Sequence, residues 1–227
     1  MTTALKVGLM VPMNNTTMEP EMLAWLPAGS TCTTLRIPRG KGLLTAESIP
    51  EYKAQALFLA RQFAAMDLDV VAYGCTAASF ISGPEGDAQL ARELAEITGK
   101  PVVTTAQSMV IALREDNAKD IALVTPYTDL VNRQLKAYLA NSGIRVQRFN
   151  SFYAADVEEL GRIQADAVAR LAGETMDDEC EAMFIACSQL PTYEILDGLR
   201  NRFGRPVWSS VQATARQATR AGRLQTA

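Results

Sequence analysis

The chain has 227 residues, of which 48% are hydrophobic and 21% are charged, a composition typical of a soluble globular protein. Its formal net charge of −3, without any basic cluster carrying interleaved aromatic residues, argues against nucleic-acid binding. No stretch approaches the roughly 18 apolar residues of a membrane span, and the first residues do not resemble a signal peptide, so we expect a cytoplasmic protein and no membrane partner.

Short apolar runs bounded by turn residues alternate with longer segments of helical periodicity, which predicts β-α repeats and a parallel sheet. In chain order, the predicted strands are Lys6–Pro12, Cys32–Ile37, Asp69–Gly74, Pro101–Thr105, Asp120–Thr125, Ile144–Phe149, Ala182–Ala186 and Pro206–Ser209. The main predicted helices are Pro50–Met66, Ala88–Ile97, Asp129–Ala140, Val157–Ala172 and Thr192–Arg202.

The two halves of the chain repeat one another. Val7–Pro12 (VGLMVP) parallels Ile121–Pro126 (IALVTP), and the apolar run that ends at Cys75 parallels the run that ends at Cys187. The spacing between matching positions changes only through loop lengths, as a duplication predicts.

This repeat predicts two pseudo-symmetric Rossmann-like α/β domains, residues 1–116 and 117–209, each with a parallel four-stranded sheet flanked by helices. A C-terminal helix over residues 210–227 could pack back on the first domain. Ligands of open α/β sheets bind beyond the carboxyl ends of the strands, so we expect the active site in the cleft between the domains. The loops after the first and third strands of each half are the candidates: Pro12–Thr17, Gly74–Gly83, Pro126–Asp129 and Cys187–Pro191.

Cys75 and Cys187 each end a predicted strand, and each is followed by a hydroxyl residue. Thiols serve as nucleophiles, acids and bases, so a pocket with two of them needs no histidine, and this chain has none. A single free cysteine is more often a small buried apolar residue, but two at duplicated positions favour a catalytic pair. Four cysteines without paired spacing, in a chain without histidine, indicate reduced thiols and argue against a zinc site.

Other polar residues of these loops have two interpretations each. Asn15 could donate its amide to a carboxylate, although a threonine that follows it is expected to cap the next helix. Tyr127 could donate its hydroxyl into the cleft or only pack at a domain interface. Outside these loops, Arg36 and Arg39 flank Pro38 at the end of the second strand; either could approach a dicarboxylate, with exposure to solvent as the simpler interpretation.

Four segments resemble a known family. Val11–Glu19 and Ala186–Pro191 are similar to maleate isomerase motifs, and Thr125–Tyr127 is similar to a tyrosine loop. Gly74–Phe80 mixes isomerase and decarboxylase traits. Together they resemble the Asp/Glu/hydantoin racemase superfamily, in its branch of maleate cis-trans isomerases and arylmalonate decarboxylases.

The resemblance implies roles for particular residues. A thiol at Cys75 would be the isomerase nucleophile, where decarboxylases have glycine, and Cys187 would be the acid and base. The same resemblance implies that no metal or organic cofactor is used. The expected substrate-binding residues are Asn15, Thr76, Ala77, Tyr127 and Ser188. One departure is Asp156, near a position where the isomerases carry asparagine, and an aspartate there would repel a dianion.

The leading hypothesis is cis-trans isomerisation of maleate or a related cis-ene-dicarboxylate. The alternatives are a two-cysteine racemase or epimerase acting α to a carboxylate, an arylmalonate-type decarboxylase, and a two-lobed small-molecule sensor. In each case the ligand is a small carboxylate or dicarboxylate. We expect a homodimer or a higher homo-oligomer, since symmetric assemblies are common.

Overall fold

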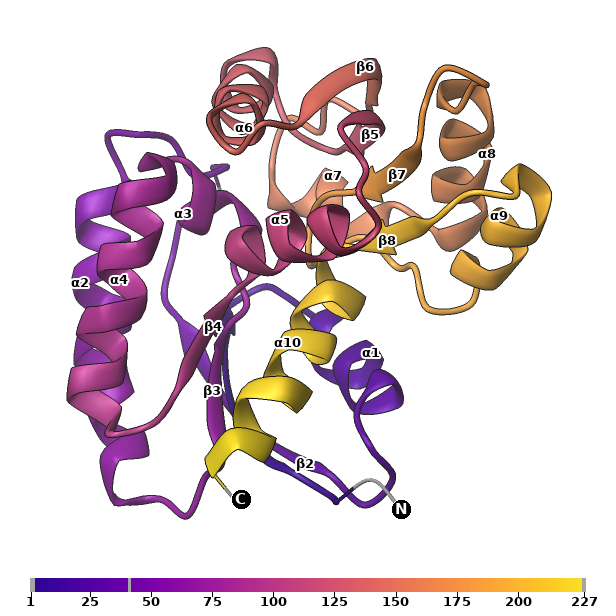
Figure 1. Ribbon diagram of the computed structural model, residues 1–227. Coiled ribbons are helices and arrows are strands. Elements are labelled where there is room, and N and C mark those ends of the chain that lie inside the picture. The colour runs from indigo at the N-terminus through magenta and orange to yellow at the C-terminus, as the bar shows by residue number, and fades with distance from the viewer. Residues whose placement is uncertain (1–2, 41, 226–227) are drawn as a thin grey trace.

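A computed structural model describes residues 3–40 and 42–225 and shows two sheets, one from each half of the chain (Figure 1). The strands are β1 (Lys6–Pro12), β2 (Thr31–Ile37), β3 (Val70–Tyr73), β4 (Val102–Thr104), β5 (Asp120–Thr125), β6 (Arg145–Ser151), β7 (Ala182–Ile185) and β8 (Val207–Ser209). The helices are α1 (Met18–Trp25), α2 (Ile49–Ala60), the 3-10 helix η1 (Arg61–Ala65), α3 (Thr76–Phe80), α4 (Gly83–Thr98), α5 (Thr105–Glu115), α6 (Asp129–Asn141), α7 (Val157–Arg162), α8 (Ala165–Thr175), α9 (Leu196–Phe203) and α10 (Ser210–Gln225). None of these helices is long and apolar enough to cross a membrane.

The two sheets share one topology. The first has the strand order β2-β1-β3-β4 and the second β6-β5-β7-β8, and every pairing is parallel. The predicted fold class, two pseudo-symmetric four-stranded α/β units, is therefore confirmed. The domain limits 1–116 and 117–209 remain a prediction.

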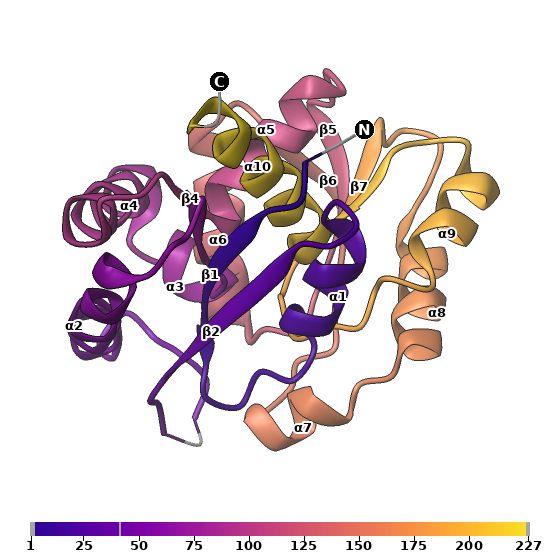
Figure 2. The ribbon, with the colours of Figure 1, turned by 90° about the horizontal axis from the view of Figure 1, so that it is seen from below.

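Alternating side chains bury both faces of the first sheet. On β1, Met10 packs in a cluster with residues of α2 and α4, whereas Leu9 and Val11 pack with residues of α1 and α10. This is the period of two expected of a strand buried on both sides. The helices α2 and α4 thus cover one face, and α1 and α10 cover the other (Figure 2). The C-terminal helix α10 therefore returns from the second sheet to the first.

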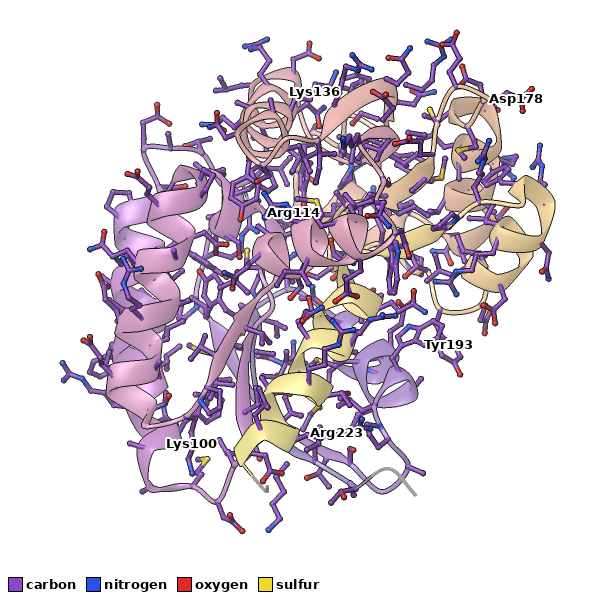
Figure 3. The ribbon with its side chains drawn as sticks, in the orientation of Figure 1. Lys100, Arg114, Lys136, Asp178, Tyr193 and Arg223 are labelled. Atoms are coloured by element: carbon purple, nitrogen blue, oxygen red, sulfur yellow. The ribbon has the colours of Figure 1, made fainter. Side chains whose placement is uncertain are left out.

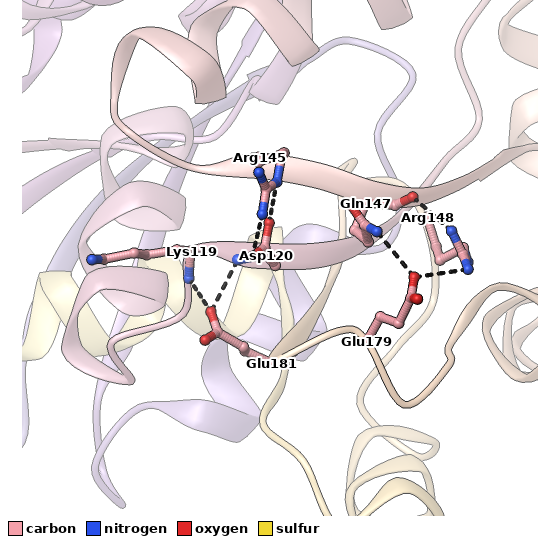
Figure 4. A network of polar contacts seen from close by, with 7 residues as sticks. All are labelled: Lys119, Asp120, Arg145, Gln147, Arg148, Glu179 and Glu181. Carbon is pink, nitrogen blue, oxygen red and sulfur yellow. Dashed lines mark hydrogen bonds and ion pairs between the residues drawn. The ribbon is translucent and has the colours of Figure 1, made fainter.

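The duplication is visible in hydrogen bonds as well as in topology. In the first half, Asp69, just before β3, accepts the backbone N–H of Lys6 at the start of β1 over 2.7 Å. In the second half, Glu181, just before β7, accepts the N–H groups of Lys119 and Asp120 at the start of β5 (Figure 4). The same acidic contact therefore ties the first and third strands of each sheet together.

The predicted helix over Val157–Ala172 is wrong in one respect, because the structure breaks it into α7 and α8. The break is at Ile163 and Gln164, whose backbones are extended. Gly161, just before the break, is a weak helix former. The separation leaves Leu160 of α7 free to line a cavity between the sheets, while α8 packs against β5 and β6.

Candidate active site

A cavity of about 30 Å³ lies where the loops at the carboxyl ends of the two sheets meet. The loops after β1, β3, β5 and β7 all contribute to it, together with the β2–α2 loop and parts of α6 and α7. It is lined by Pro12, Asn14, Asn15, Arg39, Leu43, Leu44, Cys75, Thr76, Ala77, Tyr127, Val131, Leu160, Cys187, Ser188 and Gln189. All seven residues that the sequence analysis selected for the site are thus brought to one cavity.

Cys75 lies between β3 and α3, with only 4% of its surface exposed. Burial raises the pKa of its thiol. The backbone N–H groups of Ala78 and Ala77, the positive charge of Arg39 and the hydroxyl of Tyr52 act on the pKa in the opposite direction. An arginine, a tyrosine and backbone amides, and not a histidine, thus offset part of the rise that burial causes in the pKa of this thiol.

Cys187 follows β7 in a conformation that is rare for a residue with a side chain, with φ of 147°. Burial raises the pKa of its thiol to about 11, while the N–H of Gln189, 3.4 Å from Sγ, and the hydroxyl of Tyr127 act against that rise. The negative charge of a Cys75 thiolate raises this pKa further. At neutral pH, Cys187 is therefore a protonated thiol beside a second thiol, and it can donate a proton.

Tyr127 follows β5 and is buried, with its ring edge-to-face on Phe80 at a centroid distance of 5.6 Å. Its hydroxyl lies near Cys187 and Thr76 but has no hydrogen-bond partner among the described residues. Burial, together with the neighbouring thiols, keeps the pKa of Tyr127 well above its ordinary value, so it is a neutral donor. Tyr127 packs between the halves and also lines the cavity, and donation of its hydroxyl to a ligand stays a prediction.

Asn15 connects the two halves. Its Oδ1 accepts the N–H groups of Thr17 at 3.1 Å and Met18 at 2.9 Å, so Asn15 caps the start of α1. The predicted threonine cap is wrong, because the Thr17 side chain makes no capping bond. Asn15 Nδ2 donates to Ser188 Oγ over 3.1 Å, and Ser188 Oγ donates to the carbonyl of Gly74 over 2.7 Å. This chain of bonds joins the loops after β1, β7 and β3.

Two residues that sequence reasoning missed hold the same loops. Gln189 forms a reciprocal pair with Thr16, accepting its N–H at 3.0 Å and donating to its hydroxyl at 3.1 Å. Ser210, at the start of α10, accepts both the hydroxyl of Thr76 and the N–H of Cys187 at 3.1 Å. The repeat gave no signal for Ser210, because it belongs to the helix that crosses from the second sheet to the first.

Arg39, which has two interpretations in the sequence, also lines the cavity, together with an apolar wall that sequence reasoning missed. The expectation that Arg39 is exposed to solvent is wrong: it is half-buried and lines the cavity. Leu43 and Leu44 of the same loop, Val131 of α6 and Leu160 of α7 form the apolar lining. Consecutive leucines in a glycine-rich loop were the available signal, since an exposed loop rarely needs them.

Asp156 does not line the cavity. Its carboxylate caps α7 instead, with Oδ1 accepting the N–H groups of Glu158 and Glu159 at 2.9 Å each. The expectation that Asp156 would repel a dianion at the site is therefore wrong. Helix capping explains an aspartate here, since a carboxylate at the first turn satisfies free N–H groups.

The cavity is suited to a small anion. Two of its lining residues carry buried donors with no partner in the part of the chain that the structure describes, Arg39 Nε and Tyr127 Oη. Unpaired buried polar groups are uncommon, and a ligand often satisfies them. Within residues 3–40 and 42–225, no group of three or more cysteine, aspartate or glutamate side chains could hold a metal ion.

Comparison with known proteins agrees with this geometry. The chain is 27% identical to the maleate isomerase of Geobacillus stearothermophilus, over 97% of this chain and 93% of that protein. It is 27% identical to the arylmalonate decarboxylase of Bordetella bronchiseptica, over 77% and 73% of the two chains. A Nocardia farcinica maleate cis-trans isomerase, a cysteine-to-serine mutant with a covalently bound succinylcysteine intermediate, superposes with a TM-score of 0.88 at 27% identity, over 96% and 93% of the two chains. Residues 7–227 match the family model described as arylmalonate decarboxylase, and the chain belongs to that family.

Proposed function

We propose that this protein is a cofactor-independent cis-trans isomerase that converts maleate, or a closely related cis-ene-dicarboxylate, into its trans isomer. The observation that carries the proposal is that Cys75 and Cys187, one from each half of the chain, line the same buried cavity. The succinylcysteine intermediate of the Nocardia farcinica relative supports covalent chemistry on a cysteine. The similarity to maleate isomerases over nearly the whole chain supports the choice of substrate.

In the proposed first step, the Cys75 thiolate forms a bond to one alkene carbon. The alkene π pair moves toward the other alkene carbon and its carboxylate, which becomes an enediolate. Neutral donors that contact this group stabilise the developing charge, typically by about 3–4 kcal/mol for each well-placed donor. The unpartnered hydroxyl of Tyr127 supports this step, because the enediolate would be its first hydrogen-bond partner.

In the second step, the Cys187 S–H donates a proton to the enediolate carbon and leaves a saturated thioether on Cys75. The former double bond is now single, so the two carboxylate-bearing carbons can rotate from the cis to the trans arrangement. The Cys187 thiolate then removes the proton, the alkene re-forms, and the C–S bond breaks to release Cys75 as a thiolate. A thiol with a pKa of about 11 supports the initial donation, because it is protonated at neutral pH.

Proton NMR of maleate incubated with the reduced protein tests the proposal. We expect fumarate from the wild type and no turnover by Cys75→Ser. Cys187→Ser should also lose turnover, and it should accumulate a maleate adduct on Cys75 that mass spectrometry detects. Cys32→Ser is the matched control, because Cys32 lies outside the cavity. Maleate left unchanged by the wild type, or full activity in Cys75→Ser, would contradict the proposal.

A second candidate is decarboxylation of a substituted malonate. The family match and the apolar wall of Leu43, Leu44, Val131 and Leu160 favour it, since such a wall accommodates an apolar substituent. The presence of a thiol at Cys75 weighs against it, because the resemblance implies glycine there in decarboxylases. Release of CO₂ from phenylmalonate, without fumarate formation from maleate, would select this function instead.

The oligomeric state and the cellular compartment follow from general features of the chain. We infer a homodimer or higher homo-oligomer in the cytoplasm. The four cysteines are free, which fits a reducing compartment, and two-fold assemblies are the commonest kind. Size-exclusion chromatography with light scattering tests the assembly, and a monomer at micromolar concentration would contradict it.

A further inference from the structure

Among the described residues that line the cavity, Arg39 is the one with a side chain of formal positive charge. The other polar side chains there are amides, hydroxyls and the two thiols. A dicarboxylate carries two negative charges into this buried space. Burying a charge without a counter-charge is costly, so the position of this one cation matters for what the cavity can bind.

One hydrogen bond holds the Arg39 guanidinium in place, and its Nε–H has no acceptor among the described residues. It lies in the loop between β2 and α2, half-buried, and its Nη2 donates to the carbonyl of Gly42 over 2.5 Å. Its Nε is buried and has no hydrogen-bond partner among the described residues. A guanidinium has five donors arranged as a planar fork that matches a carboxylate. The loop therefore presents an arginine whose Nε–H is available to donate a hydrogen bond to a ligand.

The charge of Arg39 acts on one side of the cavity. Burial raises the pKa of the Cys75 thiol and of the Tyr52 hydroxyl, and the positive charge of Arg39 opposes part of that rise at both groups. The main groups that act on Cys187 are instead neutral donors and Cys75 itself. The two ends of the cavity thus differ, with a cation near Cys75 and neutral hydroxyls and amides around Cys187.

We propose that Arg39 binds one carboxylate of the substrate beside Cys75 and so selects ligands with a carboxylate at that position over neutral analogues. The second carboxylate then occupies the neutral end, near Tyr127 and Thr76. This inference rests on the proposed function for the identity of the substrate. It adds a specificity-determining residue from the β2–α2 loop, which the duplicated loops after the first and third strands do not include.

The test compares two alkylating reagents on the intact protein, iodoacetate (an anion) and iodoacetamide (neutral). Both react with the same Cys75 thiolate, so any change in thiol pKa cancels in the ratio of their rate constants. We expect the ratio at Cys75, followed by peptide mass spectrometry, to fall by roughly tenfold or more in Arg39→Gln. Arg39→Lys, which keeps the charge, should retain most of the ratio.

Lys53→Gln is the matched control, because it removes one positive charge from α2, where Lys53 pairs with Glu93 outside this cavity. It should leave the ratio unchanged. An unchanged ratio in Arg39→Gln, or an equal fall in Lys53→Gln, would overturn the proposal. Should Arg39→Gln fail to fold, an unchanged ratio in Arg39→Ala or Arg39→Met would overturn it as well.

Steady-state kinetics separate this inference from the proposed function. In Arg39→Gln, the KM for maleate should rise at least tenfold, while binding of the neutral crotonamide, measured by protection of Cys75 from iodoacetamide, should change much less. Equal losses for maleate and crotonamide would overturn the selectivity. Failure of the wild type to convert maleate would defeat the proposed function, whereas the alkylation ratio would still decide whether Arg39 binds anions.

Discussion

At the scale of single residues, the site depends on buried donors that the protein itself leaves unpaired. The Tyr127 hydroxyl and Arg39 Nε are both buried, and neither has a partner in the described part of the chain. Leaving a buried polar group unpaired costs about 1–3 kcal/mol. Their position beside the two thiols means that a bound carboxylate would remove this cost, which couples ligand binding to stability.

The variant Tyr127→Phe tests this view of the hydroxyl. We expect kcat/KM to fall about 10²–10³-fold, because one donor to the enediolate is lost. The free energy of unfolding should stay constant or rise slightly, since no internal hydrogen bond is removed. Enzyme kinetics and urea denaturation measure the two effects.

Tyr138→Phe is the matched control. The Tyr138 hydroxyl donates to Asp87 Oδ2 over 2.9 Å and does not line the cavity. This variant should lose stability and keep its activity. A Tyr127→Phe protein that instead loses stability and keeps its activity would show that the hydroxyl is structural.

At the scale of elements, the strand-end loops approach each other closely. Gly74, between β3 and Cys75, donates its N–H to the carbonyl of Met10 over 2.7 Å. A Cβ at this position would lie 2.9 Å from that carbonyl oxygen and would also collide with the Met18 sulfur. A glycine is therefore needed for the first sheet to bring Cys75 to the cavity.

Gly74→Ala should destabilise the protein by about 1–3 kcal/mol, because the collision forces backbone shifts. It should also lower activity, since Cys75 is the next residue. Gly198→Ala in α9 is the control: a Cβ there meets nothing within 4 Å, and alanine favours a helix over glycine by about 0.5–1 kcal/mol. Thermal denaturation and maleate turnover check both variants, and equal stability of the two would contradict the packing argument.

At the scale of the whole molecule, polar contacts join the two halves. Asn15 reaches Ser188, and the carboxylate of Glu21 in α1 accepts the backbone N–H groups of Thr192 and Tyr193 beyond β7. The ring of Tyr193, labelled in Figure 3, then packs edge-on against Trp25 of α1 at a centroid distance of 4.9 Å. These contacts fix the relative position of the halves, on which the distance between the two thiols depends.

Asp87 is a further link of this kind, and it titrates. Its Oδ2 accepts hydrogen bonds from Thr104 of the first half and Tyr138 of the second, at 2.8 Å and 2.9 Å. Burial raises the pKa of this carboxyl to about 6, although those bonds oppose the rise. Because the folded state holds the proton more tightly than the unfolded state, this group stabilises the fold at low pH. That contribution is lost as the pH rises from about 4 to about 6.

Asp87→Asn should remove this pH dependence. We expect the free energy of unfolding of the wild type, relative to the variant, to fall by about 2 kcal/mol between pH 4 and pH 7. Urea denaturation across this range measures the difference. Asp178→Asn is the control, since Asp178 is exposed at the periphery of the second half (Figure 3). Parallel curves for wild type and Asp87→Asn would contradict the prediction.

Local pattern in the sequence predicted most of the fold. The bounds of β1 and β5 agree with the predicted Lys6–Pro12 and Asp120–Thr125. A buried strand appears in the sequence as a run of apolar residues, and this run stops where the turn residues begin. The repeat predicted that Cys75 and Cys187 lie at equivalent strand ends. Since ligands of open α/β sheets bind beyond the carboxyl ends of the strands, and we expected the site in the cleft between the two domains, it also predicted that both belong to one site.

The tertiary structure alone decided which other groups surround those thiols. Arg39 and Arg36 look alike in the sequence, yet Arg39 lines the cavity, whereas Arg36 donates to the Asn15 carbonyl and pairs with Glu19 at the surface. The physical reason is that apolar periodicity encodes which face of an element is buried, but not which loops meet when two sheets pack. A polar loop residue has the same local pattern whether it faces solvent, a helix end or a substrate, and only the packed fold distinguishes these cases.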